Sequence, residues 1–168
     1  MKHLLLIGEH ELTIDDKNRL SLPSDIRKSM TPERDGGFFY LVLGINLKPW
    51  LYPERYYEDL VFQAQPEITP GDEQVDFSHA NFALADRVFW DGQGRMGIPE
   101  KALRRSELGR EVTLIGAGDH LEIWNRGDWE VRREEILKRH AEIAIKAKRA
   151  RQNPNSAANN GGPAAPNS

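Results

Sequence analysis

A twelve-residue pattern that occurs twice in this chain restricts its possible folds more than any other feature. Residues 12–23 and 88–99 both read apolar-x-apolar or aromatic-Asp-x-x-x-Arg-apolar-small-apolar-Pro, at an offset of 76 residues. A second block recurs in the same order at an offset of 72, in residues 51–58 and 123–130. Internal repeats of this kind indicate one structural unit built twice. We therefore expect two similar halves within the chain of 168 residues.

Each half is expected to contain two β-hairpins and two helices. Apolar residues alternate on either side of each polar turn, as in a half-buried strand. The turn residues Asn18, Gly92 and Gly94 tolerate a positive φ. Pro23 and Pro99 then end a strand and favour the start of a helix. The helices predicted from these signals and from apolar spacing span Ser24–Met30, Glu100–Ser106, Phe77–Val88 and residues 128–150.

Neither half is large enough to be stable alone, because a unit of about 50 residues with four short strands buries too little surface. We therefore expect the halves to exchange hairpins and share one core, which predicts an α+β protein. The predicted segments are a first half at 6–60, an acidic and partly helical linker at 61–85, a second half at 86–130, a basic C-terminal helix at 131–151 and a disordered tail at 152–168.

The net charge of −3 hides two segments of opposite sign. Residues 53–86 carry eight Asp and Glu against one Arg, a net charge of −7. Residues 126–151 carry nine Lys and Arg against five Asp and Glu, a net charge of +4. Nucleic-acid binding depends on the local patch that faces phosphate rather than on the total charge. The composition therefore permits a DNA-binding surface but argues against one copy holding DNA by bulk charge.

The repeated turns contain the candidate functional residues. Arg19 and Arg95 follow the hairpin tips, where a guanidinium can bind phosphate or a guanine edge with two hydrogen bonds. One alternative is an Asp–Arg pair that only stabilises a tight hairpin. The recurrence of the pair in both halves favours matching basic tips, as a two-fold DNA reader needs. The predicted DNA-binding residues are Arg19, Arg95, Lys17, Asn18 and Gln93, and the predicted turn-shaping residues are Asp15 and Asp91.

Catalysis and cofactor binding have little support in the sequence. The chain has no cysteine, which excludes disulfides and cysteine-ligated metal sites. Its five histidines lack the spacing of metal ligands, and no nucleophile elbow, phosphate loop or dinucleotide fingerprint is present. We expect no enzyme activity, no catalytic residues, no cofactor, no metal and no small-molecule substrate. No apolar run approaches the roughly 18 residues of a membrane span, so we expect a cytoplasmic protein.

The doubled Asp-x-x-x-Arg-apolar-x-apolar-Pro pattern, followed by Tyr-Pro or Trp-Asn and an aromatic helix start, resembles the MraZ family over about residues 6–135. These bacterial transcriptional regulators contain two SpoVT-AbrB-type swapped-hairpin motifs. The resemblance implies an AbrB-like, double-psi type of β-barrel with pseudo-two-fold symmetry and flanking helices. It also implies a nucleoid-associated homo-oligomeric ring that binds repeated boxes in double-stranded promoter DNA and represses its own division and cell-wall gene cluster. Arg19 and Arg95 would contact DNA, and Asp15 and Asp91 would shape the turns.

A second interpretation remains open, namely an AbrB-like antitoxin or another protein-interaction module without strong DNA specificity. An antitoxin would normally contain one motif and a disordered tail that binds its partner. Here the motif is doubled, and the tail at 152–168 has no charge and no large apolar side chain. We therefore favour the regulator.

Overall fold

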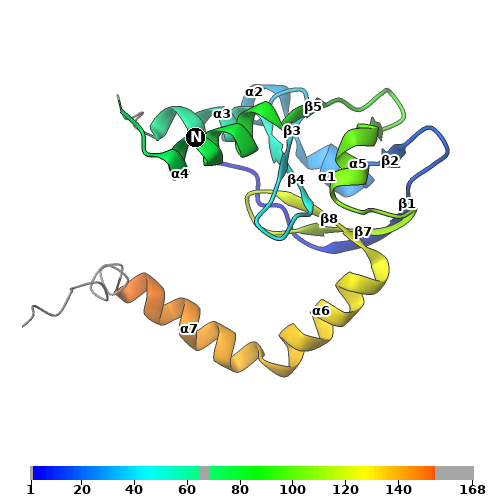
Figure 1. The fold of residues 1–168 in the computed structure, drawn as a ribbon. Helices are drawn as coiled ribbons and strands as arrows, with labels where there is room; N and C mark the ends of the chain where they lie inside the picture. Colours follow the sequence, from blue (N-terminus) through cyan, green and yellow to red (C-terminus); the bar gives the residue numbers. More distant parts are fainter. Residues whose placement is uncertain (1, 65–68, 154–168) are drawn as a thin grey trace, which may run out of the picture. The chain divides into compact units, whose positions relative to one another are not determined.

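The computed structural model describes residues 2–64 and 69–153 (Figure 1). The chain divides into two compact units, with the boundary between Trp129 and Glu130. The tail predicted to be disordered lies, from residue 154 onward, outside the described residues. None of the described helices has the length and apolar character needed to cross a membrane. Both copies of the repeated pattern belong to the first unit.

Antiparallel strands form the centre of the first unit (Figure 1). Within the described part of the chain, one sheet has six strands in the order β1-β7-β8-β4-β3-β5, and a two-stranded sheet pairs β2 with β6. The strands are β1 (Glu9–Thr13), β2 (Arg19–Ser21), β3 (Phe39–Leu43), β4 (Pro49–Pro53), β5 (Asp86–Val88), β6 (Arg95–Gly97), β7 (Glu111–Gly116) and β8 (Leu121–Asn125).

The strand order has the symmetry of the repeat. Strands β1, β2, β3 and β4 of the first half correspond to β5, β6, β7 and β8 of the second. When each strand of the six-stranded sheet is replaced by its counterpart, the same strand order results, read from the opposite edge. The first strand of each half pairs with the other half, since β1 pairs with β7 and β5 pairs with β3. Two further strand pairs between the halves, β4 with β8 and β2 with β6, join equivalent strands. The predicted α+β class is confirmed, while the closed barrel, the exchanged hairpins and the exact segment boundaries remain predictions.

The hydrophobic core is shared between the halves. Leu20 and Met96 lie opposite each other in the β2–β6 pair, and both are fully buried. Leu51 and Leu121 form a second fully buried pair across β4 and β8. All four side chains belong to one contiguous cluster. Burying such a side chain contributes about 1.5–3 kcal/mol, and each half supplies part of the surface that buries the other.

Short helices follow the strands of each half. As predicted, helices begin directly after Pro23 and Pro99, and Ile26 and Ala102 anchor them in the core. Proline suits these positions because its fixed φ matches a helix start and it has no N–H to leave unpaired. The helices of the first unit are α1 (Ser24–Ser29), α2 (Pro32–Asp35), α3 (Glu54–Gln63), α4 (Asp72–Ser78), the π-helix η1 (His79–Ala83) and α5 (Glu100–Arg105).

Two predicted helices have different bounds in the structure. The helix predicted at Phe77–Val88 is wrong in its last residues, because Asp86–Val88 forms β5 and pairs with β3 instead. The helix predicted at 128–150 is divided into α6 (Arg126–Lys138) and α7 (His140–Gln152). The break lies at Arg139, whose φ of −112° and ψ of 11° are outside the helical range. Apolar spacing alone could not show this break, since neither glycine nor proline marks it.

A buried polar cluster joins the halves beside the β4–β8 pair. His120 is only 8% exposed, and its ring lies between two carboxylates. Its Nδ1 is 2.6 Å from Asp119 Oδ1, and its Nε2 is 3.2 Å from Glu122 Oε1. Trp50, from the first half, stacks on the imidazole with ring centroids 4.2 Å apart. The cluster therefore connects a loop and strand of the second half to β4 of the first.

Both carboxylates of the cluster also bind side chains of the first half. The Tyr56 hydroxyl donates to Asp119 Oδ2 at 2.8 Å, and Asn46 Nδ2 donates to Glu122 Oε2 at 3.2 Å. Burial disfavours a charge on His120, but hydrogen bonds to Glu122 and Asp119 outweigh burial and raise the pKa of His120 above its ordinary value. Burial alone would raise the pKa values of Asp119 and Glu122. Their hydrogen bonds with His120 outweigh burial, so that both pKa values are lowered. The favoured form is thus an imidazolium between two carboxylates.

Candidate nucleic-acid interface

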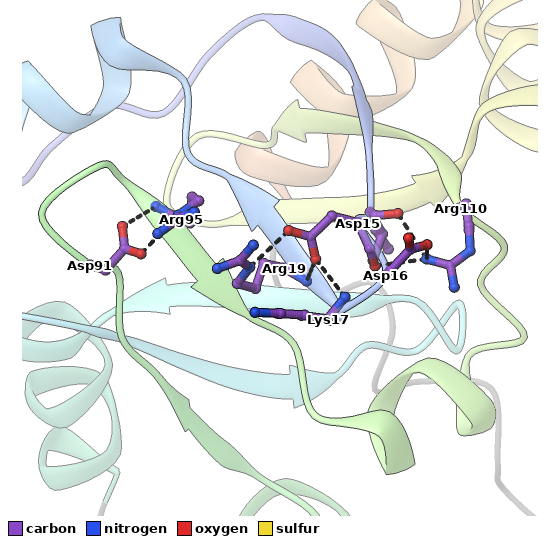
Figure 2. Close-up of polar contacts among 8 residues, drawn as sticks. Asp15, Asp16, Lys17, Arg19, Asp91, Arg95 and Arg110 are labelled. Carbon is purple, nitrogen blue, oxygen red and sulfur yellow. Dashed lines mark hydrogen bonds and ion pairs between the residues drawn. The ribbon is translucent and has the colours of Figure 1, made fainter.

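The first repeated turn is closed by the carboxylate of Asp15 (Figure 2). Asp15 Oδ1 accepts hydrogen bonds from the backbone N–H groups of Lys17 at 2.9 Å and Arg19 at 2.8 Å. Its Oδ2 accepts from Arg19 Nε at 2.8 Å. The backbone N–H of Arg19 is the main cause that lowers the pKa of Asp15. Asn18 completes the turn with a φ of 57°, a conformation that asparagine tolerates better than most residues.

The second turn repeats this arrangement with different residues at its tip. Asp91 Oδ1 accepts from the backbone N–H groups of Gln93 at 2.9 Å and Arg95 at 3.0 Å. Its Oδ2 accepts from Arg95 Nε at 2.9 Å. The backbone N–H of Arg95 is again the main cause of a lowered pKa, here that of Asp91. Gly94, with a φ of 80°, takes the place that asparagine has in the first turn. The predicted turn-shaping contacts are therefore present in both halves, although the tip sequences differ.

The β2–β6 pair joins the two turns, with one turn at each end of the pair. In its register Leu20 lies opposite Met96, and Arg19 and Arg95 lie on either side of this central pair. Side chains alternate between the faces of a strand. Because Leu20 and Met96 point into the core, both arginines point away from it, on one common face (Figure 2). The two halves thus build a single basic patch rather than two separate ones.

Each arginine remains available to a further partner. Its Nε is used by the aspartate of its own turn, but no group among the described residues accepts a hydrogen bond from Nη1 or Nη2 of Arg19 or Arg95. The two side chains are 29% and 34% exposed. A guanidinium oriented in this way can donate to phosphate or to a guanine edge. Stabilising the turn and binding DNA are therefore compatible roles for the same side chain.

The other predicted DNA-binding residues lie at the tips of the turns. Lys17 and Gln93 are exposed and Asn18 is half-buried. Within residues 2–64 and 69–153, hydrogen bonds to these three residues involve only their backbone groups. Their side chains can reach a ligand that covers the patch, and their role in binding remains a prediction. In the same part of the chain, no three His, Asp or Glu side chains are placed to hold a metal ion.

Two further arginines beside the turns were not identified from the sequence. Arg110 Nη1 donates to the backbone oxygen of Asp15 at 2.7 Å and lies 3.5 Å from Asp16 Oδ1 (Figure 2). Arg27, on α1, lies against the turn at Gly94. Neither arginine belongs to the repeated pattern, so the repeat could not indicate it. Both add positive charge next to the predicted binding residues.

The close fit at Gly94 gives a first testable prediction. Gly94→Ala should destabilise the protein by roughly 1–2 kcal/mol, because a side chain at positive φ is strained and a Cβ here would also collide with Arg27. Gly92→Ala is the matched control, since a Cβ at Gly92 meets nothing within 4 Å. Thermal unfolding of both variants measures the difference. Equal melting temperatures would show that the second turn does not depend on a glycine.

Comparisons with known proteins identify the family of the chain. A family model described as "MraZ protein, putative antitoxin-like" matches residues 82–153. A protein named transcriptional regulator MraZ from Pediococcus pentosaceus is 30% identical over 142 residues, which cover 83% of this chain and 94% of the relative. The protein of the same name from Dictyoglomus thermophilum is 31% identical over 145 residues, 84% of this chain and 95% of the relative. The Clostridium tetani protein of this name is 26% identical over 147 residues, 84% of this chain and the full length of the relative. Since these relatives match along most of both chains, the chain belongs to the MraZ family.

Proposed function

We propose that the protein is a sequence-specific DNA-binding transcriptional regulator whose contact surface is the patch formed by Arg19 and Arg95. The main support is the pairing of β2 with β6, which brings the arginines of two equivalent Asp–Arg turns onto one face. The relatives are named transcriptional regulators, which is consistent with this role. Such a protein would act in the cytoplasm, at the nucleoid.

The spacing of the two arginines indicates how one copy would read DNA. They are diagonal neighbours across an antiparallel pair, a relationship that typically separates the residues by about 7–8 Å, and their Cβ atoms by somewhat less. Two half-sites on one face of DNA lie about 34 Å apart, so one copy cannot occupy both. We infer that each copy reads one box through one patch. Binding to repeated boxes then requires several copies held together.

A homo-oligomer, such as a ring, would supply these copies. The net charge of −3 predicts that a single patch binds weakly. Linking several patches raises the overall affinity by about 100- to 10,000-fold without any new contact, provided that the boxes match the spacing of the patches. A regulator of this kind would repress the division and cell-wall gene cluster that contains its own gene, by covering repeated boxes in the promoter.

Oligomer formation can be checked directly. We expect multi-angle light scattering to give a mass several times that of the 19.2 kDa chain, because the proposed avidity needs linked copies. The measurement should be repeated over a dilution series, with a monomeric protein of similar size as the standard. A mass equal to one chain at all concentrations would remove the multivalent mechanism.

The function itself is tested by fluorescence anisotropy with the protein's own upstream DNA, against a scrambled duplex of equal composition, over a salt series. We expect tighter binding to the natural sequence and a steep decrease of affinity with salt, since phosphate contacts release counterions. Equal binding to both duplexes at every salt concentration would contradict the proposal. It would favour the antitoxin-like interaction module, which a search for protein partners would then examine.

A further inference from the structure

The two segments of opposite charge lie outside the repeated turns that form the proposed DNA-reading patch. The acidic segment, residues 53–86, includes α3, α4 and η1. The basic segment, residues 126–151, includes α6 and most of α7. Both segments also expose large apolar side chains, among them Phe77 at 66% and Ile143 at 36%. Charge of opposite sign together with exposed apolar surface is typical of two surfaces that bind each other.

The acidic segment forms the wall of an apolar groove with a volume of about 490 Å³. The β3–β4 hairpin contributes Ile45, Leu47 and Trp50 to the groove, α3 contributes Leu60, and α4 contributes Phe77. Among these, Ile45 is 94% exposed and Leu47 is 61% exposed. Concentrated apolar exposure of this kind marks an interaction site on a soluble domain. The groove can therefore bury the apolar face of a partner.

The charges around the groove define the chemistry of that partner. None of the described residues that line the groove is charged. The helices that form its wall are acidic, because α3 has a net charge of −2 and α4 has a net charge of −3. A partner with an apolar face and basic flanks would be attracted to this surface, whereas an acidic one would be repelled.

Helix α7 of this protein has these properties. Ile143, Ala147 and Ala150 follow the i, i+4, i+7 spacing that places side chains on one face of a helix. Lys146 and Arg151 border this face on its two sides, and the helix carries four Lys and Arg against one Glu. Alanine at two of the three positions allows the helix backbone to approach a groove closely. Helix α7 is thus complementary to the groove in both polarity and charge.

We propose that α7 of one copy binds in the apolar groove of a second copy. The contact joins two different surfaces of the chain, so it is head-to-tail and forms a ring when the rotation between copies closes. The inference rests on the proposed homo-oligomer and identifies the surfaces that hold it together. In this contact the basic segment of one copy would be attracted to the acidic segment of the next.

Disulfide trapping tests the contact, because the chain contains no cysteine of its own. Ile45→Cys is introduced at the rim of the groove in one preparation. Ala147→Cys is introduced in a second preparation that carries a longer tag, so that mixed dimers have a distinct size. The matched control is Ile145→Cys, about 200° around the helix from Ala147 at 100° per residue. After mixing and mild oxidation, we expect at least five-fold more mixed dimer with Ala147→Cys than with Ile145→Cys.

Each other outcome has a defined meaning. Equal yields from the two α7 positions would overturn the proposed face. A chain that carries both Ile45→Cys and Ala147→Cys and crosslinks only within itself would show that its own helix occupies the groove, which overturns binding by a second copy. An oligomer by light scattering without preferential crosslinking would leave the proposed function standing and overturn only this inference. A monomer would contradict both.

A pair of charge substitutions gives an independent measurement. Ile143→Asp should reduce the mass found by light scattering at least two-fold, because it puts a carboxylate in the apolar face beside acidic helices. Ile145→Asp, on the opposite side of α7, should leave the mass within about a tenth of the wild-type value, given that it lies outside the proposed contact. Equal masses for the two variants would overturn the proposed contact.

Discussion

Replacing Arg19 or Arg95 by alanine is expected to weaken binding to the promoter DNA by about 5- to 150-fold for each substitution, the range of one bidentate arginine contact. Each substitution also removes one positive charge from the proposed DNA-binding surface, so the slope of log affinity against log salt should decrease by about 1. The protein should stay folded, since both side chains point away from the core. Anisotropy titrations and thermal unfolding measure the two properties separately.

Two further variants make this test specific. Arg19→Lys keeps the charge but removes the planar fork, so it should retain affinity for scrambled DNA while losing preference for the natural sequence. Arg55→Ala is the control, because Arg55 is an exposed arginine on α3, where its Nε donates to the backbone oxygen of Pro32. Folded Arg19→Ala and Arg95→Ala variants that bind as the wild type does would show that the paired turns have only a structural role.

The second large effect is expected at His120. His120→Gln should destabilise the protein by about 2–3 kcal/mol near pH 6, because it leaves two carboxylates without their cation. A fully buried pair would cost about 3–5 kcal/mol, but the side chain of Asp119 is 43% exposed, which allows water to screen part of its charge. Thermal or urea unfolding at several pH values measures the loss. His79→Gln is the control, since His79 is exposed.

The pH dependence of the free energy of unfolding provides a second test of the role of His120. The pKa of His120 is raised in the folded state, so its contribution is fully present below its unfolded pKa of about 6.5 and is lost as the pH rises through the folded value. The lowered pKa values of Asp119 and Glu122 act in the opposite direction, and their contribution is lost as the pH falls below about 4. Wild-type stability should therefore fall above about pH 6.5, and His120→Gln should remove this fall. An unchanged slope in the variant would contradict the proposed role of the imidazolium.

Much of the local structure could be predicted from the repeat. The pattern from Asp15 to Pro23 encodes a turn, a strand and a helix start within nine residues, and the structure forms all three in both copies. These features depend on short-range chemistry, namely an aspartate that accepts turn N–H groups and a proline that begins a helix. For that reason the positions of Arg19 and Arg95 beside the tips followed from the sequence.

The features that were missed depend on contacts between distant residues. Histidine spacing along the chain does not reveal the surroundings of His120, because its ring packs against Trp50 and Tyr52, more than 60 residues away. Arg27 and Arg110 lie outside the repeated pattern, and their proximity to the turns follows only from tertiary packing. The strand at Asp86–Val88 was assigned to a helix because its strand identity comes from pairing with β3. Local propensity cannot reveal a conformation that a distant strand imposes.

The alternation of strands from the two halves has a consequence for the synthesis of the protein. Strand β1 pairs with β7 in a register that joins Glu9 to Ile115, so the first strand to leave the ribosome must wait for more than 100 further residues. Closing a loop of this length is slow, because the chain loses conformational entropy before the stabilising contacts form. Strand edges stay unpaired during this delay. The first half cannot complete its sheet during translation, and a prematurely terminated chain would present a strand edge that is open to aggregation. The first repeat can therefore reach its folded structure only after the second repeat has been synthesised.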